Sequence, residues 1–216
     1  MTRRRIGLLG GTFDPIHIGH LALARAGRDA LSLDEVRLMP TGRSWQKSTS
    51  TASAEQRLQM VQLAVRGEDR LLADGRETLR AGSTYTVDTL AELRAECGGD
   101  PALVLLLGSD QLRNLATWHR YRDLLGFAHI ACTQRERVGL QDLPIEVEHL
   151  VHQHGRDALP DTPAGSIVFF VMPPVPVSAT VLRERLASGD RPTELVPATV
   201  LDYIETHRLY GARALL

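Results

Sequence analysis

The chain has 216 residues, of which 43% are hydrophobic, so it is long enough to bury one sizeable core. Its formal net charge of −1 excludes a global basic field that would recruit nucleic acid, so any phosphate binding must be local. There is no apolar segment of membrane-spanning length, no signal-peptide pattern, and no disulfide framework from Cys97 and Cys132, so we expect a cytoplasmic protein.

The first part of the chain alternates apolar runs of strand length with helical patterns. In chain order we expect a strand at Ile6–Leu9, a helix from Ile18, a strand at Val36–Met39 and a helix at Ala54–Val65. Ser53 should cap the second helix, because Gln56 stands three residues further on, as in a capping box. A strand–helix alternation of this kind is typical of parallel α/β folds.

The alternation continues to the end of the chain. We expect helices at Thr86–Glu96, partly at Leu112–Leu125, and at Ile145–Gln153, Ala179–Ala187 and Ala198–His207, with strands at Leu103–Leu107, Ile130–Cys132 and Ile167–Val171. The polar stretch Gln134–Gly165 is interpreted as connecting structure and not as a domain boundary. The sequence therefore predicts one α/β domain over residues 1–216, with a parallel sheet covered by helices on both faces and a small helical part from about 178 to 216.

The most informative segment lies where the first strand should lead into the first helix. It reads Gly10-Gly11-Thr12-Phe13-Asp14-Pro15-Ile16-His17-Ile18-Gly19-His20. Paired glycines let phosphates approach the backbone, and a helix start offers N–H groups and a positive dipole end. His17 and His20 should share one face of the first turn, where they can donate hydrogen bonds to phosphate oxygens. A bound polyphosphate would favour their charged forms.

Other readings of this segment are weaker. The spacing of the dinucleotide fingerprint is missing, and so is that of the lysine-containing P-loop. Two histidines at this spacing could bind zinc, but no third ligand is evident and no acid occupies the metalloprotease position. We therefore expect a phosphate site without a metal held by the protein.

This segment resembles the signature of the HxGH nucleotidyltransferase superfamily, whose members transfer a nucleotidyl group from a nucleoside triphosphate. The superfamily has a second signature, a serine-rich turn ending in arginine, and Pro176–Arg183 resembles it, with Ala179 in place of the second serine. The resemblance implies a Rossmann-like sheet. It also implies that Ser178 and Thr180 cap a helix whose N–H groups meet phosphate, while Arg183 reaches the β- and γ-phosphates.

Two later segments resemble those of bacterial nicotinate-nucleotide adenylyltransferases. Ser83–Leu90 resembles their SxYTxDTL segment, and the stretch from Gly108 to Leu125 resembles their GADxLxxLxxWxxxxxL segment. The resemblance implies that the acceptor's pyridine ring stacks on Trp118 and that main-chain N–H groups near Thr86 and at His119 hold its carboxylate. A site that offers only donors would prefer the acid to the amide.

One segment departs from the family. Pro40–Lys47 replaces a PPHK-like turn and loses the second proline and the histidine, although Lys47, the only lysine of the chain, stands where the family has its basic residue. Trp45 could cover the acceptor or simply pack. The histidines at 149, 152 and 154 lie in the polar connector and are interpreted as structural.

The resemblance thus implies three sets of site residues. The catalytic residues are His17, His20 and Arg183; the ATP-binding residues are Gly10, Gly11, Thr12, Phe13, His17, His20, Gly108, Asp110, Ser178, Thr180 and Arg183; the acceptor-binding residues are Asp14, Lys47, Tyr85, Thr86, Trp118 and His119. Mg²⁺ would travel with ATP and keep part of its water. The expected reaction joins AMP from ATP to nicotinic acid mononucleotide in NAD biosynthesis. Nicotinamide mononucleotide or pantetheine phosphate as acceptor, a non-catalytic nucleotide sensor, and homo-oligomerisation all stay open.

Overall fold

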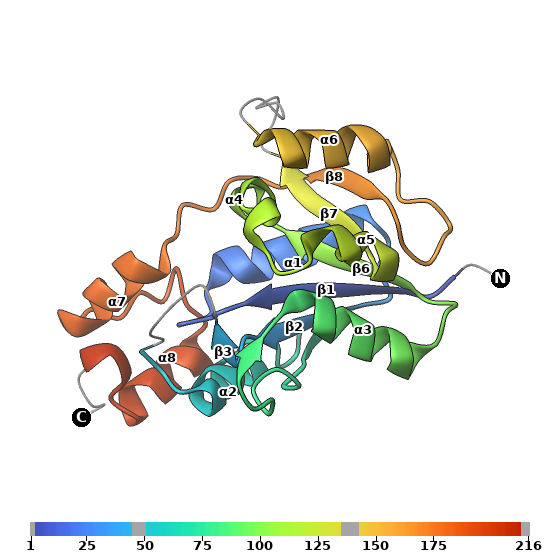
Figure 1. Cartoon of the computed structure of the whole chain (residues 1–216). Coiled ribbons are helices and arrows are strands. Elements are labelled where there is room, and N and C mark those ends of the chain that lie inside the picture. Colours follow the sequence, from blue (N-terminus) through green and yellow to red (C-terminus); the bar gives the residue numbers. More distant parts are fainter. Residues whose placement is uncertain (1–2, 45–50, 135–142, 213–216) are drawn as a thin grey trace. The chain divides into compact units, whose positions relative to one another are not determined.

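A six-stranded open sheet dominates the computed structural model, which describes residues 3–44, 51–134 and 143–212 (Figure 1). The strand order is β4-β2-β1-β6-β7-β8. The strands are β1 Arg5–Gly11, β2 Glu35–Pro40, β4 Leu71–Ala73, β6 Ala102–Leu107, β7 His129–Gln134 and β8 Ile167–Val171. The pairs β1–β6, β6–β7 and β7–β8 are parallel, and a separate parallel ladder joins β3 (Arg43–Ser44) to β5 (Ser83–Thr84).

The helices follow the predicted pattern closely. They are α1 Ile18–Ala30, α2 Ala54–Ala64, α3 Thr86–Cys97, α4 Ser109–Arg113, α5 Leu124–Phe127, α6 Ile145–His154, α7 Ala179–Ala187 and α8 Ala198–Thr206, with short 3-10 helices η1 Leu115–Thr117, η2 Tyr121–Asp123 and η3 Leu209–Gly211. The capping box of α2 is confirmed: the Ser53 hydroxyl accepts from the Gln56 N–H, and the Gln56 side chain accepts from the Ser53 N–H.

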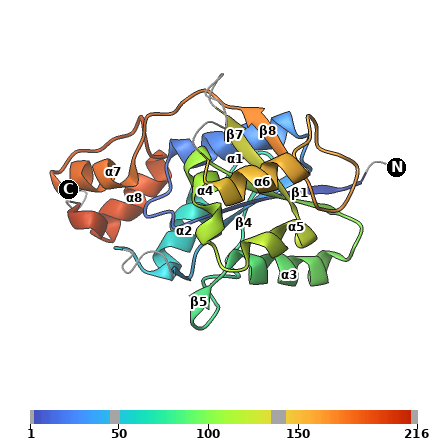
Figure 2. The same ribbon diagram turned by 45° about the horizontal axis from the view of Figure 1, so that its top comes forward.

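Both faces of the sheet are covered, as predicted. All six residues of β6 are buried, which requires packing on either side of that strand. On one side, α1 lies so close that a Cβ atom added at Gly27 would come within 2.9 Å of the Leu106 side chain. In Figures 1 and 2, α1 and α3 lie on opposite sides of β1. The Rossmann-like α/β architecture is therefore confirmed.

The chain packs as two compact units. The first comprises Met1–Leu9, Leu23–Arg37 and Tyr85–Pro174, and the second comprises Gly10–Ala22, Leu38–Thr84 and Val175–Leu216. Strands β1 and β2 each pass from the first unit into the second. In the second unit α8 packs on α2, and α7 packs on η3. A single domain over 1–216, with a helical part from about 178, stays a prediction.

A buried imidazole closes one edge of the first unit's core. His129, the first residue of β7, is fully buried, and its Nδ1 accepts a hydrogen bond from the Ser166 N–H at 3.2 Å. The ring proton therefore sits on Nε2, which donates to the Thr162 carbonyl at 2.7 Å. Burial lowers the pKa of His129, so the ring joins β7 to the segment before β8 as a neutral group.

One feature differs from the sequence prediction. The strands β3, β4 and β5 were not expected, because two or three residues are too short to show a periodicity. The prediction that Leu112–Leu125 is only partly helical is confirmed, and the helical pattern breaks where Trp118 is extended (ψ 144°) and Arg120 is left-handed (φ 52°). Within residues 3–44, 51–134 and 143–212, no helix combines the length and the apolar character needed to cross a membrane.

Candidate active site

The loop between β1 and α1 is tightly packed and begins beside open space. A Cβ atom added at Gly10 would meet no atom within 4 Å, whereas one at Gly11 would lie 3.1 Å from the Phe13 ring. Phe13 is buried, with a left-handed φ of 49°, so its ring fills the inside of the turn. The Asp14–Pro15 peptide bond is cis. The two glycines of the predicted pair thus differ: Gly10 leaves its backbone open, whereas Gly11 lets the Phe13 ring pack against the chain.

The two histidines of the segment form a stacked pair. The rings of His17 and His20 are 3.7 Å apart between centroids, with an interplanar angle of 20°. The His17 N–H donates to Nδ1 of His20 at 3.3 Å, so the neutral His20 ring carries its proton on Nε2. A Cβ atom at Gly19 would come within 2.7 Å of Cγ1 of Val177 and 3.2 Å of Cε1 of His17. Glycine is therefore required between the histidines.

His17 is neutral in the free protein. Burial lowers its pKa to about 4, against a smaller raising effect of its own backbone. Its Nδ1 is buried and has no hydrogen-bond partner within the part of the chain that the structure describes. A charged form in the presence of polyphosphate stays a prediction. An unpaired buried ring nitrogen gives this histidine an unused site for a proton or a donor.

The start of α1 offers fewer free N–H groups than expected. The Ile18 N–H donates to the Leu195 carbonyl at 2.9 Å, and the His17 N–H is taken by His20. The prediction that this helix start presents free donors is therefore wrong at these two positions. The physical reason is the fold of the second unit, which brings the segment before α8 against the helix start.

The second predicted signature contacts the first. Arg183 of α7 donates through Nη1 to the Asp14 carbonyl at 2.8 Å and through Nη2 to Oγ1 of Thr180 at 3.3 Å. Ser178 is the N-cap residue of α7, but its side chain makes no capping hydrogen bond, so the predicted capping by its hydroxyl is wrong. The Ser178 hydroxyl thus makes no capping hydrogen bond at the helix end. Arg183 holds the loop between β1 and α1 through the Asp14 carbonyl.

The structure adds a residue that the sequence analysis missed. Arg57 is 1% exposed and donates to three main-chain carbonyls, those of Thr12 at 2.7 Å, Gly42 at 3.0 Å and Ala52 at 3.4 Å. Burial lowers its pKa. One signal was available, because Arg57 stands on the buried stripe of α2, at the spacing of Met60, Val61 and Ala64. A charged residue on an apolar stripe indicates that its side chain makes hydrogen bonds inside the protein.

Asp14 is the second residue whose surroundings could not be predicted. Its carboxylate is 7% exposed and accepts three hydrogen bonds. The donors are the Thr51 N–H at 2.7 Å, the Ala52 N–H at 3.2 Å and the Tyr210 hydroxyl at 2.7 Å. Because these partners are distant in the sequence, no local pattern predicts them.

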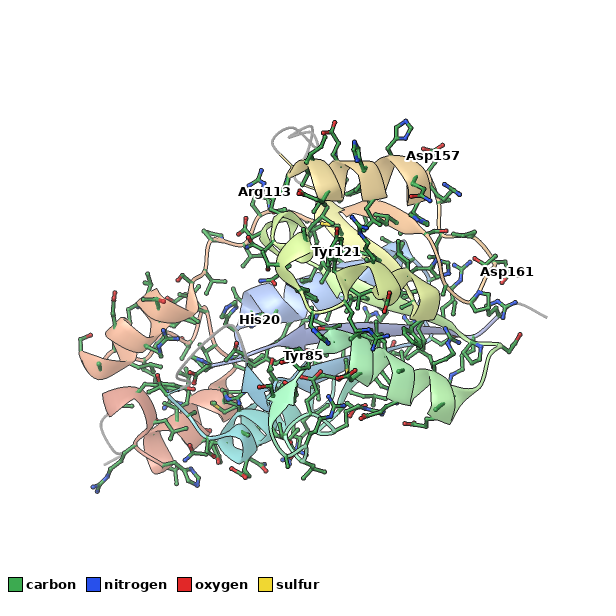
Figure 3. All side chains as sticks on the ribbon, viewed as in Figure 1. His20, Tyr85, Arg113, Tyr121, Asp157 and Asp161 are labelled. Atoms are coloured by element: carbon green, nitrogen blue, oxygen red, sulfur yellow. The ribbon has the colours of Figure 1, made fainter. Side chains whose placement is uncertain are left out.

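The predicted acceptor residues of the first unit lie together at the ends of short elements. Tyr85 is the N-cap residue of α3, at the helix start in Figure 3, and its ring lies 4.5 Å from that of His119 between centroids. Thr86 opens α3, where helix N–H groups lack intrahelical acceptors. Trp118 is half-buried, and its Nε1 is buried without an acceptor among the described residues.

The predicted nucleoside residues stand beside the carboxyl end of β6. Gly108 is the N-cap residue of α4, and Asp110 lies in its first turn with a side chain that is 87% exposed and 3.9 Å from Arg113. Cys132, in β7, is buried, which raises the pKa of its thiol to about 12, with a smaller effect of Asp110. This thiol stays protonated and is a poor nucleophile.

Three remaining predictions concern other parts of the chain. Lys47 and Trp45 lie outside the described residues. His154 ends α6, with its Nδ1 3.0 Å from the Gly165 carbonyl, in keeping with the structural interpretation. Among the described residues, no group of three or more histidine, cysteine, aspartate or glutamate side chains is placed to hold a metal ion.

An open α/β sheet whose first strand leads into a loop with two stacked histidines is the arrangement that the motifs of a nucleotidyltransferase predicted. Residues 8–185 match the profile of the cytidylyltransferase-like family. A Pseudomonas putida W619 protein, described as a probable nicotinate-nucleotide adenylyltransferase, is 45% identical over 97% of this chain and 96% of its own. A Laribacter hongkongensis protein of the same description is 47% identical over 99% and 98%. The chain therefore belongs to the cytidylyltransferase-like family and to the nicotinate-nucleotide adenylyltransferases, as its motifs predicted.

Solved structures show the same fold. The nicotinic acid mononucleotide adenylyltransferase of Plasmodium falciparum complexed with NaAD has a TM-score of 0.70 at 16% identity and covers 96% of this chain and 98% of its own. The same enzyme complexed with APC has a TM-score of 0.68 at 15% identity, with the same coverage. At these identities the likeness concerns the fold alone.

Proposed function

We propose that this protein transfers AMP from ATP to nicotinic acid mononucleotide, giving nicotinic acid adenine dinucleotide and pyrophosphate, as a step of NAD biosynthesis. The observation that carries the proposal is the 45–47% identity, over nearly the full length, to nicotinate-nucleotide adenylyltransferases. The stacked histidines of the phosphate loop support the same reaction type, because they place two imidazoles beside open backbone.

The reaction needs no covalent enzyme intermediate. An oxygen of the acceptor's 5′-phosphate attacks the α-phosphorus of ATP, and the bond from that phosphorus to the bridging oxygen breaks. Pyrophosphate leaves with the electron pair. A phosphate monoester is already ionised at neutral pH, so catalysis consists of positioning and charge stabilisation. The buried, protonated thiol of Cys132 is consistent with this scheme.

The triphosphate is assigned to the second unit. His17 and His20 meet the α- and β-phosphates as a stacked pair, and Nδ1 of His17 is a buried ring nitrogen without a partner among the described residues. Ser178 and Arg183 meet the leaving pyrophosphate, since the Ser178 hydroxyl is not used as a helix cap. These four residues belong to the ATP-binding set predicted from the motifs.

The acceptor and the nucleoside are assigned to the first unit. The N–H groups at Thr86 and His119 hold the nicotinate carboxylate, and Trp118 stacks on the pyridine ring beside the Tyr85–His119 pair. A carboxamide would lack an acceptor for its NH₂ group there, so the acid is the preferred substrate. The exposed Asp110 carboxylate binds a ribose hydroxyl of ATP.

Mg²⁺ enters with the phosphates of ATP and neutralises their charge. The residues present fit an ion that is carried by its substrate, because the buried Asp14 carboxylate is already engaged by three hydrogen-bond donors. The protein works in the cytoplasm, where ATP is supplied.

Pyrophosphate release tests the proposal. The purified protein is mixed with ATP and Mg²⁺ and with one of three acceptors: nicotinic acid mononucleotide, nicotinamide mononucleotide or pantetheine phosphate. We expect the highest kcat/KM with nicotinic acid mononucleotide. A higher value with either other acceptor would replace it as the substrate, and ATP binding without turnover on any acceptor would indicate a nucleotide sensor.

A further inference from the structure

The carboxyl-terminal 3-10 helix reaches the phosphate loop through one hydroxyl group. Tyr210 lies in η3 and is 8% exposed, and its hydroxyl donates to Oδ1 of Asp14 at 2.7 Å, across 196 positions of the sequence. The same hydroxyl lies 3.9 Å from Sδ of Met60, which is fully buried. Asp14 stands between the glycine pair and His17, so the contact falls inside the predicted phosphate motif.

The Asp14 carboxylate joins separate segments of the second unit. Its two oxygens accept from the Thr51 and Ala52 N–H groups, just before the capping residue of α2, and from Tyr210. A buried carboxylate costs free energy unless donors satisfy it, and here three donors do so. The side chain is thus held in one position by the start of α2 and by the chain's carboxyl-terminal part.

The backbone of the same loop is held from two further directions. Arg57 donates to the Thr12 carbonyl at 2.7 Å, and Arg183 donates to the Asp14 carbonyl at 2.8 Å. The residue between them, Phe13, has a left-handed φ of 49° that a bulky side chain rarely adopts. A conformation of this kind persists only where the surrounding structure imposes it.

Tyr210 itself is held in an unfavourable backbone conformation. Its φ is 57° and its ψ is 20°, in the left-handed region, although glycine occupies the very next position. Burial raises the pKa of its hydroxyl, and the Asp14 carboxylate raises it further, so the hydroxyl keeps its proton and remains a donor. Strain at this residue is offset by contacts of its side chain, among them the hydrogen bond from its hydroxyl to Asp14.

We propose that Tyr210 is a positioning residue for adenylyl transfer, which acts through the Asp14 carboxylate to fix the phosphate loop and the histidine pair that follows it. The inference rests on the proposed function, since it assigns to this loop the triphosphate of ATP. Tyr210 touches neither substrate nor the reacting phosphorus. Its hydroxyl sets the geometry of the residues that do.

Kinetics of Tyr210→Phe separate positioning from simple anchoring. The variant keeps the ring and removes the hydroxyl, and we expect kcat to fall roughly tenfold while KM for each substrate changes less than about twofold. Tyr203→Phe is the matched control, because Tyr203 lies in α8, half-buried, with its ring against His207. A folded Tyr210→Phe enzyme with wild-type kcat would overturn the proposal.

A second measurement does not depend on turnover. In the isotope-labelled protein without substrate, the imidazole NMR signals of His17 and His20 should shift in Tyr210→Phe and stay in place in Tyr203→Phe. In the control, the signals of His207 should move instead, since that ring contacts Tyr203. Unchanged His17 and His20 signals in Tyr210→Phe would refute the positioning role. If the wild-type protein failed to turn over, the proposed function would fall while this result still decided the role of Tyr210.

Discussion

The loop between β1 and α1, which we propose binds the triphosphate, and the residues of the first unit that we propose bind the acceptor are built in opposite ways. Around the loop, Asp14 and Arg57 are buried and saturated with hydrogen bonds to distant parts of the chain. On the acceptor side, His119 is exposed, and Trp118 is half-buried with a ring N–H that has no acceptor among the described residues. The backbone and the buried charges of the loop are thus held by the protein itself, with Nδ1 of His17 left without a partner among the described residues, whereas the first unit presents more exposed groups that a ligand would satisfy.

This contrast separates two kinds of contribution to the reaction. A preorganised loop costs no reorganisation when charge moves in the transition state, so its residues should act mainly on kcat. Exposed groups that bind the acceptor in the ground state should act mainly on KM or on the dissociation constant. The predictions below test that division, beginning with the largest effect.

Replacing the second histidine tests the loop at its reacting end. His20→Ala removes the Nε2–H donor and the ring that stacks on His17, and we expect kcat to fall by about 10²- to 10³-fold. The fold should stay intact, because the His17 N–H can form a hydrogen bond with water in place of the one to the His20 ring. Pyrophosphate release measures the rate, and circular dichroism with a thermal melt checks the fold. Normal turnover by folded His20→Ala would remove the histidine pair from the mechanism.

Replacing the buried arginine tests whether the loop is held from outside. Arg57→Met leaves the carbonyls of Thr12, Gly42 and Ala52 without their donor, and we expect a loss of about 3 kcal/mol in the free energy of unfolding. Arg66→Met, an exposed change two residues after α2, is the control and should stay within about 0.5 kcal/mol. Urea denaturation compares them. Equal midpoints for both variants would show that Arg57 does not hold the loop.

Acid should weaken the fold through its buried histidines. Burial lowers the pKa values of His17 and His129. Below about pH 6.5 these two side chains therefore bind protons in the unfolded chain while they are still neutral in the folded protein. The stability they contribute is therefore complete above pH 6.5 and is lost as the pH falls through the lowered pKa of each ring, which for His17 is about 4. We expect a loss of up to about 1.4 kcal/mol per pH unit for each of them.

Denaturation at several pH values between 7 and 5 measures this slope. His129→Gln should flatten it, whatever its effect on absolute stability, and the exposed His152→Gln should keep the wild-type slope. If His129→Gln and wild type lost stability in parallel, the neutral buried imidazole would not be the source of the acid sensitivity.

The smallest expected effect belongs to the acceptor side. Trp118→Ala should weaken binding of nicotinic acid mononucleotide by a factor of about 2 to 13, from a stacking energy of about 0.5–1.5 kcal/mol, and leave ATP binding unchanged. Trp118→Phe keeps an aromatic face and should lose less. Calorimetric titration with each ligand separately shows the split. Equal losses for both ligands would contradict the division between the two regions.

The sequence predicted what depends on neighbours along the chain. The capping box of Ser53 and Gln56 and the alternation of strands and helices are local patterns, and the structure confirms them. Family resemblance singled out Tyr85 and His119 in the first unit, and their rings lie together.

What the sequence could not predict depends on long-range contacts. No spacing links Asp14 to Tyr210, and nothing local shows that burial would lower the pKa of His17 to about 4. The position of the break at Trp118 and Arg120 was hidden as well, because their residue types are compatible with a helix. Tertiary packing overrides local propensity at each of these places.

The central claim is that the loop from Gly10 to His20 binds the triphosphate. A crystal structure of the protein with a non-hydrolysable ATP analogue tests it most directly. The account predicts phosphate oxygens within hydrogen-bond distance of the His17 and His20 rings, with the loop unchanged around Asp14. Phosphates bound elsewhere, with both rings still free of ligand contacts, would contradict it.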